Sequence, residues 1–230
     1  SYTIAKYLGL NTELTKAIQN NPKNNIYYYE LGKIQYRQKK YTDAVRSFTT
    51  SCDLDSSFEP SRYNLGVTQL KLKNDNAALT AFRKAIDINP RYEKAYLEEA
   101  RLLTKRKDYN GAINSYENVL AIDNTNVSAT MELGNVYYQS GKLSKAEEKF
   151  RQAISMLKPC ADLTLTKFNL STVLFDQNKI VEAEKYAREA YQEKEFVKNE
   201  KTQANIVYNY ALILDKINKV DEAIPFYMEV

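Results

Sequence analysis

Histidine and tryptophan are absent from this 230-residue sequence, and glycine, proline and cysteine are scarce. Without histidine, the sequence excludes catalytic triads that need an imidazole, imidazole general bases and histidine-ligated metal sites. Six glycines and five prolines are too few for a sheet with many tight turns. Mean hydropathy is −0.57, and no uncharged apolar run approaches the roughly 18 residues of a membrane span. We therefore expect a helical protein with little catalytic equipment and no membrane span in this segment.

Charge and cysteine content also restrict the function. Lysine and arginine total 33 against 29 acidic residues, a net charge of +4, and the two signs are interspersed rather than gathered into a basic stripe. Cys52 and Cys160 lie far apart and form no CxxC pattern, so each is expected to be a buried thiol or an ordinary loop residue. We expect no cofactor. The first residues show no targeting signal, which leaves the compartment open between the cytoplasm and a bacterial periplasm.

Small residues recur at a fixed interval along the chain. Four alanines are separated by 34 residues each: Ala44, Ala78, Ala112 and Ala146. An aromatic residue follows each of them by four positions: Phe48, Phe82, Tyr116 and Phe150. Another small residue precedes each by twelve: Gly32, Gly66, Ala100 and Gly134. Two further copies, at Ala183 and Ala223, follow at intervals of 37 and 40 residues. Such periodicity indicates stacked structural repeats.

This pattern resembles the tetratricopeptide repeat (TPR), a helix–turn–helix unit of 34 residues. The resemblance implies an all-α fold, a right-handed α–α superhelix (solenoid) in which each helix pair covers the apolar face of the next. It predicts one continuous array with these parts: residues 1–24 as the second helix of a truncated repeat, 25–58, 59–92, 93–126, 127–160 and 164–197 as repeats, and 204–230 as a truncated repeat. Arg62 and Thr130 depart from the aromatic opening position, and Glu99 replaces the usual leucine. The turn within each unit is expected at Lys39, Lys73, Lys107, Gly141, Asn178 and Asn218.

The ends and the two longer spacings carry further expectations. We expect the sequence to be a segment of a longer array, with Leu10 on its first helix. We also expect that the exposed apolar faces of the truncated repeats can lead the protein to self-associate. Three extra residues near 157–163 and six near 193–201 are expected to lengthen helices by up to about two turns. A disordered linker between two domains is the alternative.

In the TPR family the first helix of each pair lines a concave groove that binds peptides. The first three repeats place tyrosines and cations there: Tyr29, Lys33, Tyr36, Arg37, Tyr63, Lys71, Lys94, Leu97, Arg101 and Lys105. The last three place mainly apolar and aromatic residues there: Met131, Asn135, Tyr138, Phe168, Phe175 and Tyr208. The resemblance therefore implies a protein or extended-peptide partner, acidic toward one end and apolar toward the other.

Other interpretations fit the residues less well. A solvated face with ordinary repeat packing accounts for any single groove residue. A carboxylate clamp for chaperone tails is disfavoured. In the first three repeats only Asn64 and Lys94 match it, and in the last three the asparagines fit but the cations are absent: Asn135, Asn169, Asn205 and Asn209. An RNA or single-stranded nucleic-acid binder is the alternative function, but its cations do not recur in every repeat. An enzyme is not expected, since the Glu98–Glu99 and Glu147–Glu148 pairs are interpreted as surface charges.

Overall fold

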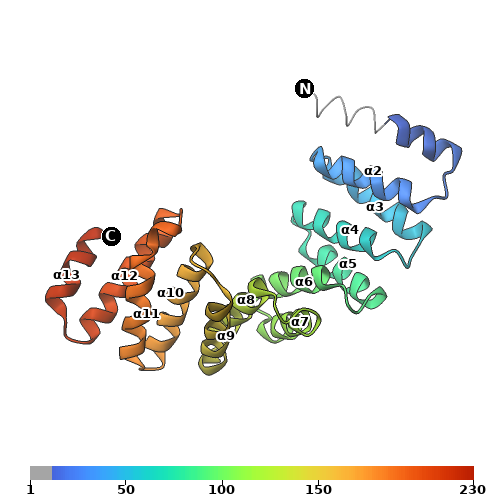
Figure 1. The fold of residues 1–230 in the computed structure, drawn as a ribbon. Coiled ribbons are helices and arrows are strands. Elements are labelled where there is room, and N and C mark those ends of the chain that lie inside the picture. Colours follow the sequence, from blue (N-terminus) through green and yellow to red (C-terminus); the bar gives the residue numbers. More distant parts are fainter. Residues whose placement is uncertain (1–11) are drawn as a thin grey trace. The chain divides into compact units, whose positions relative to one another are not determined.

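The computed structural model describes residues 12–230, which form α-helices, one short 3₁₀-helix and no β-strand (Figure 1). The all-α fold is therefore confirmed for this part of the chain. Leu10, predicted on the first helix, lies outside the described residues. The chain divides into two compact units, residues 1–105 and 106–230.

Unit 1 is built from consecutive helices that pack on their neighbours in sequence. Residues 12–20 are helical. Five complete helices follow: α2 (Asn25–Arg37), α3 (Tyr41–Leu54), α4 (Glu59–Lys71), α5 (Asp75–Ile88) and α6 (Glu93–Lys105). Helix α2 packs against α3 and α4 against α5, while α3 contacts α4 and α5 contacts α6. Helices α3, α4 and α5 thus each take part in a hairpin and in a junction between neighbouring helix pairs.

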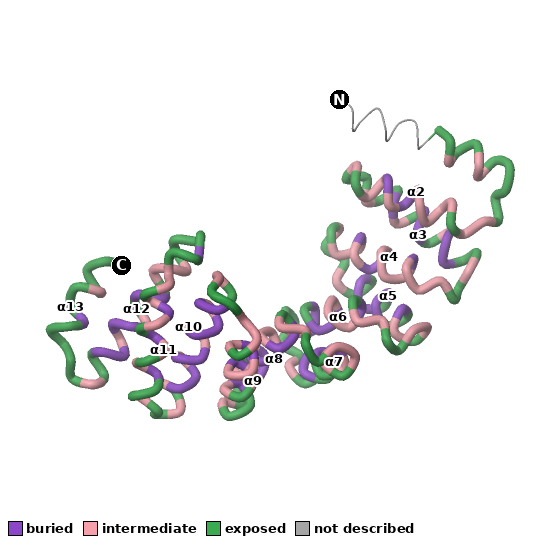
Figure 2. Tube along the Cα trace, viewed as in Figure 1, coloured by how far each residue is buried: buried purple, intermediate pink, exposed green. Residues whose placement is uncertain are grey.

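Unit 2 continues the same order. Its elements are α7 (Tyr109–Ile122), α8 (Val127–Gln139), α9 (Leu143–Met156), α10 (Ala161–Asp176), α11 (Ile180–Gln192), the 3₁₀-helix η1 (Lys194–Phe196), α12 (Glu200–Lys216) and α13 (Val220–Glu229). The hairpins are α8–α9, α10–α11 and α12–α13, and α7–α8, α9–α10 and α11–α12 form the junctions. The buried residues line the surfaces between packed helices (Figure 2).

The small residues of the repeat allow a phenylalanine ring to lie directly on the facing helix. A Cβ atom added to Gly66 would lie 2.5 Å from Cε1 of Phe82, and one added to Gly32 or Gly134 would lie 2.7 Å from the ring of Phe48 or Phe150. All three phenylalanines are at most 1% exposed. Because the rings are enclosed, they have no space to withdraw. The 34-residue recurrence of glycine and phenylalanine therefore reflects this contact.

The turns within the hairpins lie where the sequence predicts them. Lys39, Lys73 and Lys107 have φ of 61°, and the equivalent turn residues Gly141, Asn178 and Asn218 are also left-handed. In the first turn, the Lys39 N–H donates to the carbonyl of Tyr36 and the Lys40 N–H to that of Gln35, both at 2.9 Å. This pattern ends a helix with a left-handed residue. Lysine adopts that conformation at a cost of about 1–2 kcal/mol.

The two longer spacings have different structural outcomes. Helix α10 has 16 residues where α8 has 13, so the first insertion lengthens a helix, as predicted. At the second, α12 grows to 17 residues, but the segment before it forms η1 and a short loop. Val197 in that loop is 5% exposed and packs with Ala190 and Ile206. The linker alternative is wrong for both segments, and the prediction of a plain helical extension is wrong for part of the second.

Glu99 corrects one sequence interpretation. The sequence predicts a surface position for this residue, but Glu99 is only 7% exposed and accepts a hydrogen bond from Nε of Arg83 on α5 at 2.8 Å. In unit 2, Lys167 is 8% exposed and its Nζ lies 2.7 Å from Glu193 and 3.1 Å from Glu189. Both charges are paired where helices meet, because an unpaired buried charge would be costly. Their role in the fold is therefore structural.

We expect replacement of Gly66 by alanine to lower the free energy of unfolding by about 1–3 kcal/mol, because the new methyl group overlaps the enclosed ring of Phe82. Urea denaturation measures the change. Gly66→Ala combined with Phe82→Leu should recover part of the loss, since leucine leaves room for the methyl group. Stability equal to that of the wild type in the single variant would contradict the importance of this contact.

Candidate functional site

All sixteen predicted groove residues lie on α2, α4, α6, α8, α10 and α12, the helices predicted to open the repeats, and none of them is fully buried. Within a helix these residues are spaced by three, four, seven or eight positions, which places them on one side of it. We call this side the first-helix face and describe it separately in each unit.

The tyrosines of the unit 1 face are fixed by aromatic neighbours. The ring of Tyr29 meets Phe58 edge-on, with centroids 5.1 Å apart, and the ring of Tyr63 meets Tyr92 in the same way at 5.5 Å. Asn64 donates from Nδ2 to the hydroxyl of Tyr29 at 3.2 Å. Burial raises the pKa of Tyr92 to about 12, with a further contribution from Tyr63. These half-buried tyrosines therefore present a pre-organised, uncharged surface.

Three predicted groove cations of unit 1 are neutralised within the unit. Nζ of Lys33 lies 2.7 Å from Glu30 on the same helix and 4.6 Å from the ring centroid of Tyr29. The guanidinium of Arg101 lies 2.8 Å from Glu98, and Nζ of Lys105 lies 2.6 Å from Asp75. A partner carboxylate would have to compete with these ion pairs.

The remaining cations of this face are unneutralised. Arg37, Lys71 and Lys94 are exposed, and none of them makes an ion pair within residues 12–230. Arg37 and Lys71 occupy equivalent positions at the ends of α2 and α4. Tyr36 lies beside Arg37, and its ring contacts Tyr41 at 5.4 Å. Leu97 adds an apolar, half-buried side chain on α6. Unit 1 thus offers positive charge beside aromatic and apolar surface.

The unit 2 face carries a ladder of side-chain amides. Asn169 donates from Nδ2 to Oδ1 of Asn135 at 3.0 Å, which links α10 to α8. Asn209 donates to the hydroxyl of Thr172 at 3.2 Å and accepts from Ser171 at 2.9 Å, which links α12 to α10. Of these amides, only Asn135 was among the predicted groove residues. Asn169 and Asn209 fit the amide positions of a carboxylate clamp in the sequence, and they directly follow Phe168 and Tyr208, as Asn64 follows Tyr63.

The other predicted residues of unit 2 are partly engaged in packing. The hydroxyl of Tyr138 donates to Asp176 at 2.9 Å. Phe168 packs against the cluster around Val197 and is therefore partly a core residue. Tyr208 is 50% exposed, with its ring 5.8 Å from that of Tyr227. Met131 and Phe175 are half-buried, so the structure leaves apolar surface accessible on both sides of the amides.

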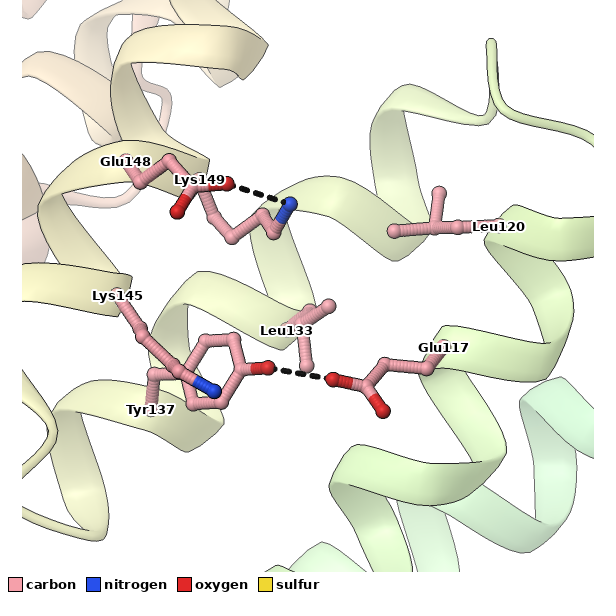
Figure 3. A pocket seen from close by; sticks show the side chains of 7 residues that line it. All are labelled: Glu117, Leu120, Leu133, Tyr137, Lys145, Glu148 and Lys149. Carbon is pink, nitrogen blue, oxygen red and sulfur yellow. Dashed lines mark hydrogen bonds and ion pairs between the residues drawn. The ribbon is translucent and has the colours of Figure 1, made fainter.

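A pocket of about 290 Å³ opens in unit 2 between α7, α8 and α9 (Figure 3). Its lining side chains are Glu117, Leu120, Leu133, Tyr137, Lys145, Glu148 and Lys149. The hydroxyl of Tyr137 donates to Glu117 at 2.7 Å, and burial together with this bond raises the pKa of Tyr137. The sequence does not predict this pocket, because Leu133 and Tyr137 are ordinary positions of the repeat pattern and Glu148 is interpreted as a surface charge.

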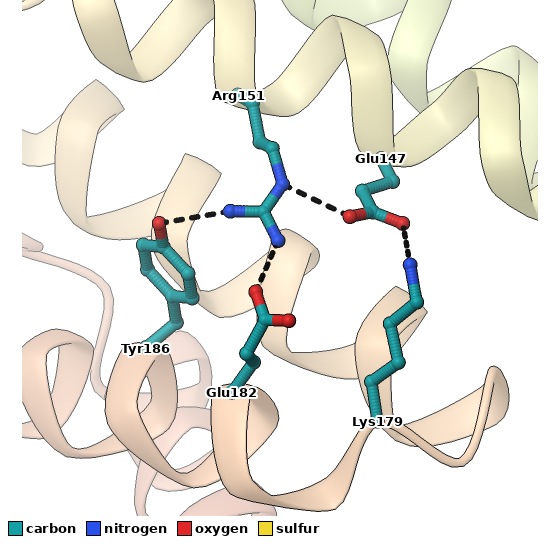
Figure 4. A network of polar contacts seen from close by, with 5 residues as sticks. All are labelled: Glu147, Arg151, Lys179, Glu182 and Tyr186. Atoms are coloured by element: carbon teal, nitrogen blue, oxygen red, sulfur yellow. Dashed lines mark hydrogen bonds and ion pairs between the residues drawn. The ribbon is translucent and has the colours of Figure 1, made fainter.

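The next junction of unit 2 carries a polar network instead (Figure 4). The guanidinium of Arg151 on α9 donates to Glu147 at 2.9 Å, to the hydroxyl of Tyr186 at 3.1 Å, and to Glu182. Lys179 donates to the other oxygen of Glu147 at 2.7 Å. Burial opposes ionisation of Glu147, but the hydrogen bonds from Lys179 and Arg151 outweigh it and lower the pKa of this carboxyl. The network joins α9 to α11.

Among residues 12–230, no cluster of three or more histidine, cysteine, aspartate or glutamate side chains is arranged to hold a metal ion. Cys52 is buried, Cys160 is partly exposed, and neither forms a disulfide. No described helix combines the length and the apolar character needed to cross a membrane.

Three family models match the chain. One described as "TPR repeat" matches residues 100–141, and two described as "Tetratricopeptide repeat" match residues 59–92 and 128–156, and residues 12–57. Together they cover more than half of the sequence. The chain belongs to the tetratricopeptide repeat family. TPR-fold proteins are in general non-catalytic scaffolds for protein interaction.

Solved TPR structures show the same fold. MamA is 24% identical, with 67% of this chain and 91% of MamA covered and a TM-score of 0.63. YrrB, described as a TPR protein with an unusual peptide-binding site, is 17% identical, with 78% and 91% covered and a TM-score of 0.71. A TPR protein from Parabacteroides merdae is 17% identical, with 99% and 87% covered and a TM-score of 0.66. No curated protein sequence gives a significant match.

We expect the Glu147 carboxylate to stabilise unit 2 in a pH-dependent way. Because its pKa is lowered from the ordinary 4.5, its contribution is present above that value and is lost as the pH falls through the lowered pKa. Glu147→Gln should therefore lower the free energy of unfolding by about 1–2 kcal/mol at neutral pH. The difference in unfolding free energy between this variant and wild type should become smaller as the pH falls below 4.5. Urea denaturation across that range measures it.

The adjacent Glu148 is the matched control, since its side chain is 66% exposed. Glu148→Gln should change the unfolding free energy by less than about 0.5 kcal/mol at neutral pH. Equal losses in the two variants, or a gap for Glu147→Gln that does not depend on pH, would disprove this role of the network.

Proposed function

We propose that this TPR protein is a non-catalytic scaffold that binds extended peptide segments of partner proteins along its first-helix faces. Unit 1 takes acidic residues, and unit 2 takes the peptide backbone together with apolar side chains. The observation that carries the proposal is the set of exposed, unneutralised cations on the unit 1 face, Arg37, Lys71 and Lys94. Family membership supports the general role of a scaffold, and these side chains support the chemistry of the partner.

The unit 1 face combines what an acidic segment requires. Arg37 and Lys71 lie on successive first helices at equivalent positions, so they can contact two places along one extended chain. The half-buried rings of Tyr29 and Tyr63 lie on the same helices and are already held by their neighbours. A partner would therefore order few side chains on binding, which reduces the entropic cost. Arginine and tyrosine are also the residue types that dominate interface energies.

The unit 2 face suits a peptide backbone. A side-chain amide has two donor hydrogens and an acceptor oxygen. Asn169 uses one hydrogen for Asn135, and Asn209 uses one for Thr172, so each amide keeps a second donor. The pairing also fixes the orientation of each amide. Peptide N–H and carbonyl groups can then be bound without regard to sequence, while Met131 and Phe175 favour apolar side chains.

A charge-reversal pair tests the proposal. Arg37→Glu with Lys71→Glu should weaken binding of a labelled peptide, with glutamates at one end and leucine and phenylalanine at the other, by about tenfold or more at physiological ionic strength. Arg46→Glu with Lys84→Glu changes the net charge equally but on the second helices of the same hairpins. This control should stay within about twofold of wild type. Fluorescence anisotropy measures affinity, and circular dichroism confirms that both variants fold.

Three results would overturn the proposal. The two charge-reversed proteins could lose affinity equally, which would indicate a non-specific charge effect. The peptide could fail to bind the wild type at all. Single-stranded RNA could bind instead, with a steep salt dependence, which would favour the nucleic-acid alternative.

A further inference from the structure

We propose that the pocket between α7 and α9 is a second docking site, distinct from the first-helix face. Its occupant is a partner helix that inserts one bulky apolar side chain and carries a carboxylate one helical turn away. The proposal rests on an open junction between α7 and α8, because residues at equivalent positions close the next junction of the chain.

The pocket faces away from the first-helix face. Along α8, residues advance by 100° each, so Met131, Asn135 and Tyr138 share one side of the helix. Leu133 and Tyr137, which line the pocket, point about 150° away from them. A peptide bound at the amide ladder therefore cannot also fill the pocket, and the two surfaces can bind different partners.

The closed junction shows what the pocket lacks. Glu117, Lys145 and Lys149 line the pocket, and the repeat spacings of 34, 37 and 37 residues place Arg151, Glu182 and Tyr186 at the equivalent positions of the next junction. There the guanidinium of Arg151 bridges from α9 to both Glu182 and Tyr186 on α11, which covers the junction (Figure 4). In the pocket, no ion pair joins Glu117 on α7 to the lysines of α9.

Tyr137 accounts for the difference. Its equivalent in the next repeat is Leu174, whose side chain makes no polar contact. The hydroxyl of Tyr137 instead donates a hydrogen bond to the Glu117 carboxylate at 2.7 Å, so this carboxylate does not pair with the lysines of α9. Nζ of Lys145 lies over the same ring, 5.3 Å from its centroid, and Lys149 binds Glu148 on its own helix at 3.0 Å. Figure 3 shows the result, an opening between α7 and α9 with Leu120, Leu133 and the Tyr137 ring as apolar lining.

The size and charge of the pocket define its occupant. About 290 Å³ admits one large side chain and is at the lower limit for a small-molecule ligand. Lys145, in the lining, and Lys142, which is not among the lining residues, make no ion pair within residues 12–230, and their Nζ atoms lie 5.3 and 6.0 Å from the Tyr137 ring centroid. Nζ of Lys142 also donates to Oδ1 of Asn110 at 3.4 Å, a contact that a carboxylate would replace. On a helix, the Cβ atoms of residues four apart lie about 5–6 Å from each other, which is similar to the distance between these Nζ atoms and the Tyr137 ring. A leucine with a glutamate one turn away therefore matches both the apolar lining and the ammonium groups.

Transplanting the closed junction tests the site. Glu117→Arg, Tyr137→Leu, Lys145→Glu and Lys149→Tyr together place the Arg151, Leu174, Glu182 and Tyr186 side-chain types in the pocket. We expect this variant to unfold at a urea concentration equal to or above that of wild type. The probe is an alanine-rich helical peptide, capped at both ends, with one leucine and one glutamate four residues apart. It should cause saturable shifts of the Leu120 and Leu133 methyl signals in wild type, and binding should weaken about tenfold or more in the closed variant.

A second variant keeps the pocket open but removes its unpaired charges. Lys142→Gln with Lys145→Gln should weaken binding of the glutamate peptide about threefold to tenfold. The same peptide with glutamine in place of glutamate should bind wild type and this variant equally. Replacing the leucine of the peptide by alanine should abolish the shifts.

Several outcomes would overturn the inference. The methyl shifts could fail to saturate, or the closed variant could bind the peptide as tightly as wild type. Affinity could be the same whether the peptide carries glutamate or glutamine. The peptide could also shift the Met131 methyl signal in place of those of Leu120 and Leu133. The last would place the peptide on the first-helix face. Loss of the charge-reversal effect on that face would leave the pocket unaffected, so the two proposals fail separately.

Discussion

The fold depends on the close approach of a phenylalanine ring to a glycine on the facing helix. At Gly32, Gly66 and Gly134 the ring occupies the volume that any Cβ atom would need. This contact brings the two backbones of a hairpin close together and leaves the opposite faces of both helices for other contacts. The first helix then has one exposed side, and the second helix has another. Because the core of the hairpin needs little side-chain volume, other faces of its helices are left for the two candidate surfaces, the first-helix face and the pocket beside Tyr137.

The sequence predicts the fold well because the constraint that determines it is local and periodic. Ala44 and Phe48 recur in register with Gly32, and a 34-residue period of small and aromatic residues has few structural solutions. The left-handed turn residues follow from the same register, which is why even Lys39 and Lys73, poor residues for that conformation, are found correctly. The segment around Val197 was less predictable, because a short loop that docks on the core has no periodic pattern.

The candidate sites are only partly predictable from sequence. Helical spacing places the groove residues on one face, but it does not show that Lys33 is neutralised by Glu30 while Arg37 is not. Such pairing depends on side-chain rotamers and on charges from neighbouring helices. Glu99 was misassigned for the same reason, since its partner Arg83 lies on a different helix. The pocket beside Tyr137 follows from one aromatic residue in place of a leucine, and it requires the coordinates of three helices to be seen.

The left-handed lysines have a consequence for how the protein opens locally. Lys39 and Lys73 each store strain at the tip of a hairpin, whereas asparagine occupies the equivalent positions in the hairpins α10–α11 and α12–α13. Because each hairpin contacts only its neighbours, strain at one tip is not shared along the array. Amide hydrogens near the tips of the α2–α3 and α4–α5 hairpins should therefore exchange with solvent sooner than those at the asparagine tips. Fluctuations of this protein would then begin at turns, while the ring-covered middles of its hairpins stay intact.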